Sequence, residues 1–174
     1  MPITPQQLLQ IPPKRRQTSQ RFCIRNKKEA SALITSKNGI SVLKYFESCS
    51  LTAYPDPATG GAPWTIGWGH TGSEVVPGLA WTQDQADAQL VIDLASREMV
   101  VSLAVTGKIT QGQFDALVSF LYNVGPGKQG VKDGLLALKN GNPSSLMRLT
   151  NAGDVAGAYA QFKFWNKAGG IPMR

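Results

Sequence analysis

The sequence has few of the residues that build covalent or metal-held frameworks. Its 174 residues include two cysteines, Cys23 and Cys49, and one histidine, His70. Two cysteines form no disulfide framework, and their spacing is not that of metal ligands. A single bridge between them stays open, but free thiols in a reducing cell are favoured. We therefore expect a domain stabilised by its hydrophobic core, for which this length suffices.

The sequence also lacks long apolar runs. None approaches the roughly 18–20 residues that a membrane span requires. The first apolar residues are interrupted by Gln10 and followed by Pro12 and Pro13, unlike the apolar stretch of a signal peptide. We expect the protein to be synthesised in the cytoplasm.

Basic charge is concentrated near the N-terminus. Residues 1–30 hold seven basic residues and one acidic, so they carry +7 − 1 = +6 of the net +7. This polar segment has no clean periodicity, and we interpret 1–30 as a disordered basic tail and 31–174 as the domain. The tail is either a solvated leader or a contact to an anionic surface. Nucleic acid is disfavoured, because aromatic residues do not interleave with the charges.

The rest of the chain predicts an α+β fold with a small β-hairpin lobe and a larger helical lobe. An apolar helical pattern, which includes Ile34, Tyr45 and Phe46, begins between Ser36 and Asn38 and leads into Glu47. Strands are expected at 51–54 and 64–68, on either side of the turn-rich PDPATGGAP. A cleft between two such lobes is a natural ligand site.

Two T-x-x-Q patterns mark the starts of the main helices. Thr82 with Gln85, and Thr110 with Gln113, match capping boxes. The first opens an amphipathic stretch toward Leu103, and the second opens an apolar helix that stops at Gly125. Shorter helices are expected at 132–139, 143–149 and 154–165.

Three residues near the hairpin suggest glycosidic bond cleavage. Glu47 ends the first helix, Asp56 follows nine residues later, and Thr65 lies in the second strand. Cleavage of a glycosidic bond uses one protonated and one ionised carboxyl group. Apolar surroundings would raise the pKa of Glu47, as a general acid requires. Taken singly, Glu47 reads as a solvated helix end, Asp56 as a turn former and Thr65 as an ordinary strand residue.

The lone His70 and the tryptophans have simpler interpretations. A single histidine is more often buried with satisfied ring nitrogens than catalytic. Trp64, Trp68 and Trp81 are expected in the core rather than as sugar-stacking platforms.

In combination these segments resemble a known family. Glu47 and Asp56, then WTIGWGHTG at 64–72, ALVSFLYNVGPG at 116–127 and WNKAGG at 165–170 are similar to the phage-type lysozymes, endolysins of glycoside hydrolase family 24. The resemblance covers roughly residues 39–170. It implies cleavage of the β-1,4 bond between N-acetylmuramic acid and N-acetylglucosamine in bacterial peptidoglycan, with lysis of the host cell.

The resemblance also implies roles for single residues. Glu47 matches the general acid, Asp56 the second carboxylate and Thr65 the threonine that positions water. Substrate-binding positions match Gly69 and Thr71 in the hairpin and Tyr122 and Asn123 in the helical wall, with His70 structural near the site. An inverting reaction is implied, which needs roughly 6.5–9.5 Å between the carboxyl groups. No metal and no cofactor are implied, and a monomer is expected.

This chain departs from the family pattern in two places. The segment PATGGAP lengthens the hairpin, and the chain stops at 171–174, so we expect the family's final helix to be missing. Loss of that helix would expose apolar surface. The tail lacks an apolar signal-arrest helix, so export to the wall is expected to need a holin-type pore.

Three other readings stay open. A lytic transglycosylase would use a single Glu, against which Asp56 and Thr65 argue. A non-catalytic peptidoglycan-binding protein on the same scaffold would hold Glu47 ionised or displaced from the cleft. A basic binder of anionic surfaces would act through its tail, with the domain incidental.

Overall fold

A computed structural model describes residues 33–57, 59–165, 167–168 and 171–172, with side chains for 33–57 and 59–165. By its contacts the chain divides into two units, Met1–Ala32 and Leu33–Arg174, and the second is described here. The basic tail at 1–30 and Cys23 lie outside the described residues. Cys49 is a free thiol, as the sequence favoured.

Helix α2 spans Lys37–Phe46 and is fixed to α4 at its start. Its N-cap is Ser36, within the predicted range, and the Ser36 hydroxyl accepts from the Gly39 N–H at 3.1 Å. The same hydroxyl donates to the Asp115 carboxylate on α4 at 2.6 Å. A Cβ on Gly39 would lie 2.7 Å from Cγ of Asp115, so only glycine permits this approach. The start of α2 is therefore held by side-chain hydrogen bonds and close packing.

The apolar pattern correctly predicted α2, but only part of the pattern is buried. Leu43 is the one residue of the helix that is buried. Ile34 precedes the helix and is 68% exposed, while Tyr45 and Phe46 are 82% and 77% exposed. Leu43 and the partly buried Ile40 meet the core formed by the later helices, whereas the other apolar residues of the pattern do not.

A three-stranded antiparallel sheet follows α2, with strand order β1-β2-β3. Strands β1 (Ser50–Pro55) and β2 (Trp64–Gly67) match the predicted hairpin, whereas β3 (His70–Thr71) was not predicted. Ala53, Ile66 and Val75 form a small core of this lobe. Trp64 and Trp81 pack against that core, as expected.

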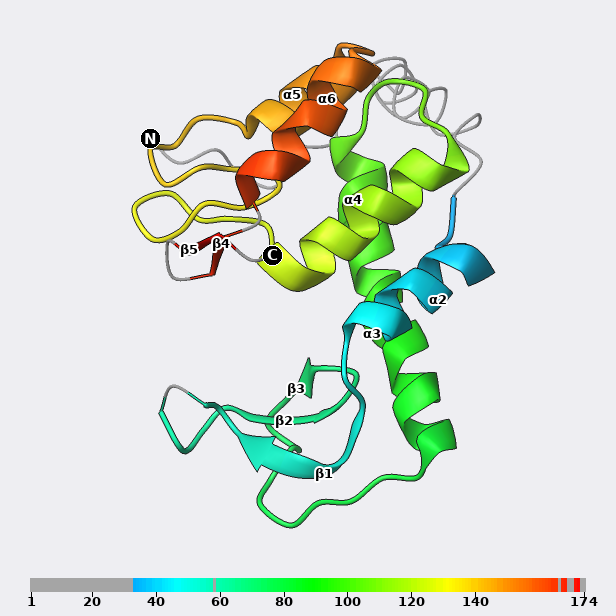
Figure 1. Ribbon diagram of the computed structural model, residues 1–174, viewed down its shortest axis with the longest axis vertical. Helices are drawn as coiled ribbons and strands as arrows, with labels where there is room; N and C mark the ends of the chain where they lie inside the picture. The colour runs from blue at the N-terminus through cyan, green and yellow to red at the C-terminus, as the bar shows by residue number, and fades with distance from the viewer. Residues whose placement is uncertain (1–32, 58, 166, 169–170, 173–174) are drawn as a thin grey trace, which may run out of the picture. The chain divides into compact units, whose positions relative to one another are not determined.

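Helices α3 (Gln83–Ala104) and α4 (Gln111–Val124) begin where the capping boxes predicted. In each helix the threonine hydroxyl accepts from the N3 amide, and the N3 glutamine accepts from the N-cap amide. The buried side of α3 ends at Val101, and Leu103 is 79% exposed. Helix α3 contacts the sheet near its start and α4 further along, so it connects the two lobes (Figure 1).

The remaining elements complete the helical lobe. Helices α5 (Ser145–Asn151) and α6 (Val155–Gln161) and the 3-10 helix η3 (Phe162–Trp165) follow α4, close to two of the predicted helical ranges. Strands β4 (Lys167–Ala168) and β5 (Ile171–Pro172) pair with each other. Leu90, Phe114, Val118, Leu135 and Leu146 are among the thirteen buried residues of the main core.

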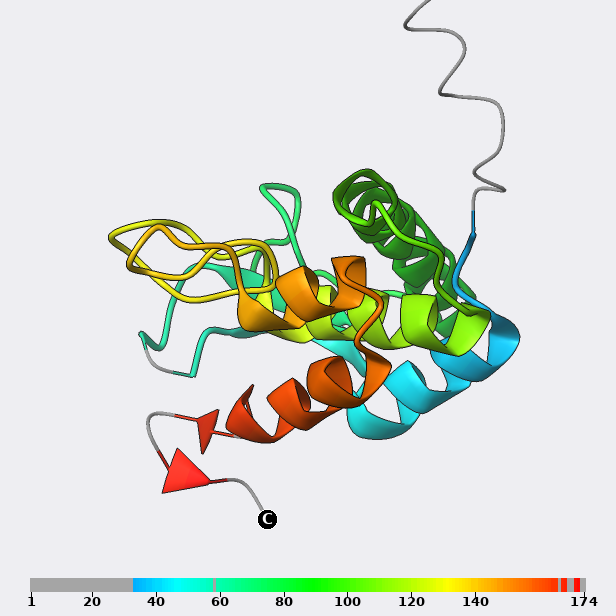
Figure 2. The same ribbon diagram turned by 90° about the horizontal axis from the view of Figure 1, so that it is seen from above.

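The helix predicted at 132–139 is wrong, and the segment is a series of turns. It loops out from the end of α4 (Figure 2, yellow). The N–H groups of Leu135 and Leu136 donate to carbonyls of Gly125 and Pro126, so they are not available for helical bonds. A Cβ on Gly134 would lie 2.0 Å from the Gly127 nitrogen. Backbone bonding to the α4 terminus therefore outweighs the local helical pattern.

The observed α+β architecture is the one expected. Within the described residues, every helix is too short or too polar to cross a bilayer. The lobes are a small sheet with its own core and a helical body with the main core.

Candidate active site

Glu47 is the C-cap residue of α2, and its backbone N–H donates to the Leu43 carbonyl at 2.9 Å. Its side chain is half-buried. Burial raises the pKa of the Glu47 carboxyl above its usual value, and a hydrogen bond from the Asn123 side chain partly opposes this shift. The expected direction is confirmed. The desolvation does not come from a buried Tyr45 or Phe46, because both side chains are exposed.

Tyr122 is the second residue of the helical wall, and it links that wall to the hairpin. Its hydroxyl donates to the Trp68 carbonyl at 2.6 Å, and the Arg97 guanidinium lies 5.1 Å from its ring centroid. Burial, together with the negative charges of Asp93 and Glu47, raises the pKa of Tyr122 to about 12, although Arg97 lowers it. Tyr122 therefore stays a hydrogen-bond donor at physiological pH.

Gly69 lies against Tyr122. A Cβ on Gly69 would lie 3.8 Å from the Tyr122 hydroxyl, and its φ of +96° is one that glycine adopts without strain. The predicted hairpin position and the predicted helical position are thus neighbours.

Thr65 lies in the middle strand of the sheet. It pairs with Tyr54 on β1 and with Thr71 on β3, so Thr65 and Thr71 are direct neighbours. Thr65 is half-buried and Thr71 is exposed, whereas the adjacent Ile66 is fully buried in the small core. The alternation of the strand therefore directs Thr65 away from the core that holds Ile66.

Asp56 follows the last residue of β1 and is half-buried. Its Oδ1 accepts from the Thr59 N–H at 3.0 Å, and its carbonyl accepts from Gly60 at 2.8 Å. Asp56 therefore forms a turn, as the simpler interpretation of this residue predicted. The turn fixes the carboxyl group at the end of the strand that pairs with Thr65.

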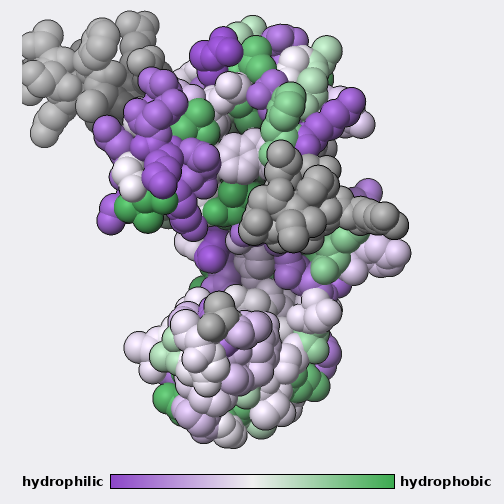
Figure 3. Space-filling view, turned by 60° about the vertical axis from the view of Figure 1, so that its left-hand side comes forward, coloured by the Kyte–Doolittle hydropathy of each residue, from purple (hydrophilic) through white to green (hydrophobic). Residues whose placement is uncertain are grey.

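The surface is hollowed between the sheet and the helices in a space-filling view (Figure 3). The helical side of this site carries Glu47, Tyr122 and Asn123, and the sheet side carries the other predicted residues, namely Asp56, Thr65, Gly69 and Thr71. The structure brings Glu47 together with Asn123, Tyr122 with Gly69, and Thr65 with Thr71.

His70 has a structural environment, in agreement with the simpler interpretation. Its Nδ1 lies 2.9 Å from Asp93 Oδ2, and its Nε2 lies 2.7 Å from Glu74 Oε1. Burial lowers the pKa of His70, but the hydrogen bonds and charges of Glu74 and Asp93 outweigh burial and raise it. Both ring nitrogens are engaged by carboxylates, so the imidazolium form links β3 to α3.

The partners that hold the hairpin, Asp93 and Asp87, were not predicted from the sequence. Asp93 is a buried acid within the apolar stripe of α3, beside Leu90 and Leu94. A carboxylate at such a position is rarely buried without a partner, and this was the available signal. Trp68 packs partly against the main core, as expected. Its indole N–H also donates to Asp87 at 2.7 Å, which the sequence did not indicate.

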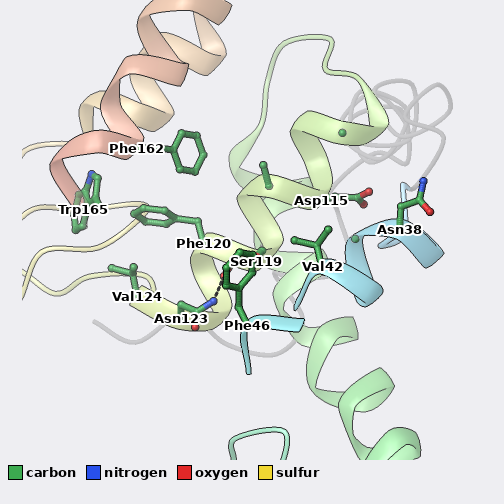
Figure 4. Close-up of a pocket in the computed structure, with 13 residues that line it drawn as sticks. Asn38, Val42, Phe46, Asp115, Ser119, Phe120, Asn123, Val124, Phe162 and Trp165 are labelled. Atoms are coloured by element: carbon green, nitrogen blue, oxygen red, sulfur yellow. Dashed lines mark hydrogen bonds between the residues drawn. The ribbon is translucent and has the colours of Figure 1, made fainter. Parts of the chain in front are cut away.

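An open cavity lies beside the site rather than in it. It has a volume of about 750 Å³ and lies between α2, α4 and η3, against Val42, Phe46, Phe120 and Asn123 (Figure 4). Its lining is mainly apolar, and its one carboxylate, Asp115, is bonded to Ser36. Phe120 packs edge-on against Phe162 and Trp165, where the WNKAGG motif begins. The cavity therefore supplies no catalytic group, although Asn123 borders it.

Among the residues with described side chains, no three His, Cys, Asp or Glu side chains cluster as a metal site would require.

Comparison with known proteins identifies the family. The phage lysozyme family model matches residues 44–174. The endolysin of Bacillus phage PZA is 42% identical over 135 residues, which are 78% of this chain and 47% of that protein. The chain spans less than half the length of several endolysins that it matches.

Two solved structures share the fold. A mutant of the P22 lysozyme aligns with a TM-score of 0.63 and 32% identity, over 80% of this chain and 88% of that one. The muramidase domain of SpmX from Asticaccaulis excentricus aligns with a TM-score of 0.62 and 31% identity, over 79% and 84%. The family model covers three quarters of the sequence, including every predicted site residue, so the chain belongs to the phage lysozyme family.

Proposed function

We propose that this chain is the catalytic domain of a phage endolysin, a muramidase that hydrolyses the β-1,4 bond between N-acetylmuramic acid and N-acetylglucosamine. The observation that carries the proposal is the Glu47 carboxyl group, held at the end of α2 with a pKa raised by burial. A carboxyl group that keeps its proton closer to neutral pH can donate it to a leaving oxygen. Family membership and the similarity to the muramidase domain of SpmX support this chemistry.

In the proposed reaction Glu47 acts as the general acid. Its proton passes to the bridging glycosidic oxygen as the bond to the anomeric carbon breaks. The Asn123 amide bonds the Glu47 side chain, so it orients the carboxyl group and also accommodates the carboxylate that remains after transfer. Burial thus raises the pKa of Glu47 and the hydrogen bond lowers it. This balance suits a group that both gives and regains a proton.

The sheet side supplies the second half of the reaction. The transition state resembles an oxocarbenium ion, and the Asp56 carboxylate stabilises positive charge at the anomeric carbon. Asp56 and Thr65 together orient the attacking water from the face opposite the leaving group, and the Asp56 carboxylate accepts the proton that this water loses. The product is then inverted at the anomeric carbon. The turn at Asp56 and the pairing of Thr65 hold these groups on one rigid hairpin.

The substrate-binding residues follow the same division. Gly69 and Thr71 on the hairpin, with Tyr122 and Asn123 on α4, line the groove for the polysaccharide strand. Tyr122 acts mainly by joining the two walls, because its hydroxyl already donates to the Trp68 carbonyl. The protonated form of Glu47 and the carboxylate of Asp56 suffice for this reaction, so the proposal invokes no metal or cofactor.

The biological setting is part of the proposal. The protein is made in the host cytoplasm, reaches the wall through a holin-type pore and acts as a monomer. The basic segment at 1–30 adds attraction to anionic wall polymers or lipid headgroups. Deletion of 1–30 should leave peptidoglycan hydrolysis intact, because the catalytic groups lie in the second unit.

The test is product analysis on purified peptidoglycan with the protein and its Glu47→Gln variant. Hydrolysis releases reducing ends, and we expect Glu47→Gln to lower the rate about 10²–10⁴-fold, because general acid catalysis is lost. Asp84→Asn is the matched control, since Asp84 is an exposed carboxylate on α3. Circular dichroism checks that each variant is folded.

Two outcomes would contradict the proposal. Anhydro-muramic ends in place of reducing ends would indicate a lytic transglycosylase. Binding without cleavage by the wild-type protein would indicate a non-catalytic wall-binding domain.

A further inference from the structure

Side chains from two helices meet the hairpin at one carboxylate, Asp87. Lys44 Nζ on α2 lies 2.8 Å from Asp87 Oδ2, and the Trp68 indole N–H donates to Asp87 Oδ1 at 2.7 Å. The Lys44 ammonium also lies 5.0 Å from the centroid of the Trp68 ring. Each member of this Lys44–Asp87–Trp68 cluster therefore contacts the other two.

The cluster joins the elements that carry the predicted catalytic groups. Lys44 lies three residues before Glu47, within the last turn of α2. Trp68 follows the end of β2, the strand that carries Thr65. Asp87 belongs to the second turn of α3, which packs on the sheet. The contacts at Asp87 therefore fix where the end of α2 sits relative to the hairpin.

Trp68 is held at a second point. Its carbonyl accepts from Tyr122 on α4, while its side chain contacts Lys44 of α2 through the ring and Asp87 of α3 through the indole N–H. A residue held through both its backbone and its side chain has little freedom to shift. The Asp87 carboxylate has a third partner, the Gln83 side chain, which donates to Oδ1 at 2.9 Å. Gln83 also belongs to α3, so the carboxylate is oriented from within its own helix as well.

Electrostatics supports this view of the cluster. Hydrogen bonds from Lys44 and Trp68 lower the pKa of Asp87 to about 2, so Asp87 is ionised wherever the enzyme would work. The Lys44 and Asp87 side chains are 28% and 41% exposed. A pair so exposed contributes little to the free energy of unfolding. Loss of the pair should nevertheless lower the reaction rate, because a small displacement of one wall relative to the other misplaces the reacting groups.

We propose that Lys44 and Asp87 are positioning residues, which hold the end of α2 and the Trp68 turn at the spacing the reaction needs between Glu47 and Thr65. Neither residue touches the reacting atoms in this proposal. The inference rests on the proposed muramidase function. It adds to that function two residues that act through Trp68 and through the end of α2.

The experiment measures kcat and KM on soluble peptidoglycan fragments for variants of the full chain. We expect Lys44→Met to lower kcat about three- to tenfold, and Asp87→Ala about ten- to thirtyfold, because Asp87→Ala removes the acceptor of both partners. KM should change less than twofold, since no group that binds substrate is removed. The double variant should be no slower than Asp87→Ala, because both changes break the same cluster.

Two further variants separate positioning from a general effect on folding. Lys44→Arg keeps the ion pair and the stacking on Trp68, so it should recover at least half of kcat. Lys37→Met removes an exposed lysine from the first turn of the same helix and should leave kcat unchanged. Thermal unfolding of each variant verifies that the protein is folded at the assay temperature.

The outcomes are distinguishable. If wild-type protein releases no reducing ends, the proposed function fails and this inference falls with it. If wild-type protein is active and Lys44→Met has the same kcat as Lys37→Met, the positioning inference alone is overturned. A rise in KM with unchanged kcat would also overturn it, because the cluster would then affect binding instead of the geometry of the reaction.

Discussion

The helical wall and the sheet wall of the site are built in different ways. Glu47 belongs to a lobe whose core has thirteen described buried residues, whereas the sheet carrying Thr65 has a core of three, Ala53, Ile66 and Val75. A three-residue core gives a small lobe little stability of its own. The sheet is therefore held by contacts to α3 and α4, namely those of His70 and Trp68.

This difference has a consequence for the chemistry. The helical wall provides a partly desolvated place for Glu47, which must keep its proton in the proposed reaction. The sheet wall provides a hairpin turn in which an exposed backbone amide, that of Thr59, bonds the Asp56 carboxylate. The two carboxyl groups to which the proposed reaction gives opposite tasks thus lie in lobes of opposite character.

After the loss of activity already expected for Glu47→Gln, the largest effect is expected when the charge on the sheet wall is removed. Asp56→Asn keeps an oxygen that can accept from the Thr59 N–H, so the turn should survive. The loss of the carboxylate should lower the rate of peptidoglycan hydrolysis about 10²–10³-fold, because stabilisation of the oxocarbenium-like transition state is lost. Reducing-end release by folded protein is the measurement. A rate within threefold of wild type would mean that Asp56 serves the turn alone.

A smaller effect is expected when the link between sheet and α3 is removed. His70→Asn should lower the free energy of unfolding by about 2 kcal/mol near pH 6, because hydrogen bonds between charged groups are lost. The folded-state pKa of His70 lies above its ordinary value of 6.5. The stabilisation is therefore fully present below about pH 6.5 and is lost as pH rises through the raised pKa.

Urea unfolding at several pH values measures this effect. The difference between wild type and His70→Asn should shrink as pH rises. Glu74→Gln should retain part of the effect, because Asp93 still bonds Nδ1. A difference that stays constant with pH would show that His70 stabilises by packing rather than by charge.

The smallest effect is expected on the helical wall and has the opposite sign. Burial raises the pKa of Glu47, so its ionised form destabilises the folded state once pH exceeds the ordinary value of 4.5. Glu47→Gln should therefore raise the free energy of unfolding at pH 7, by less than about 1 kcal/mol, because solvent screens the half-exposed site. Below pH 4 the two proteins should have equal stability. A loss of stability at pH 7 would indicate that the Asn123 hydrogen bond outweighs desolvation.

Local signals in the sequence determined much of the fold. The two capping boxes located the starts of α3 and α4, and Gly125 located the end of α4. These predictions succeeded because capping depends on residues within one turn of each other. The hairpin β1–β2 was likewise set by strand formers around a turn-rich segment. The residue pattern also identified the family, and it predicted catalytic roles for Glu47 and Asp56 that stay predictions.

Other features depended on contacts between distant segments, and there the local pattern failed. Residues 132–139 have a helical pattern, but their amides bond the end of α4. Tyr45 and Phe46 follow the period of α2, yet no later element covers them among the described residues. The third strand is two residues long and exists because β2 pairs with it.

The sequence by itself identified the family and the residues proposed to carry the chemistry, because residue type and order are read directly from the chain. Only the tertiary structure decided their environment. Glu47 gains a raised pKa through burial beside α4, and His70 becomes a charged link through Asp93 and Glu74. Asp87 meets Lys44 and Trp68 across three elements. Desolvation and ion pairing depend on which segments meet in space, and the spacing of residues along the chain does not determine which segments meet.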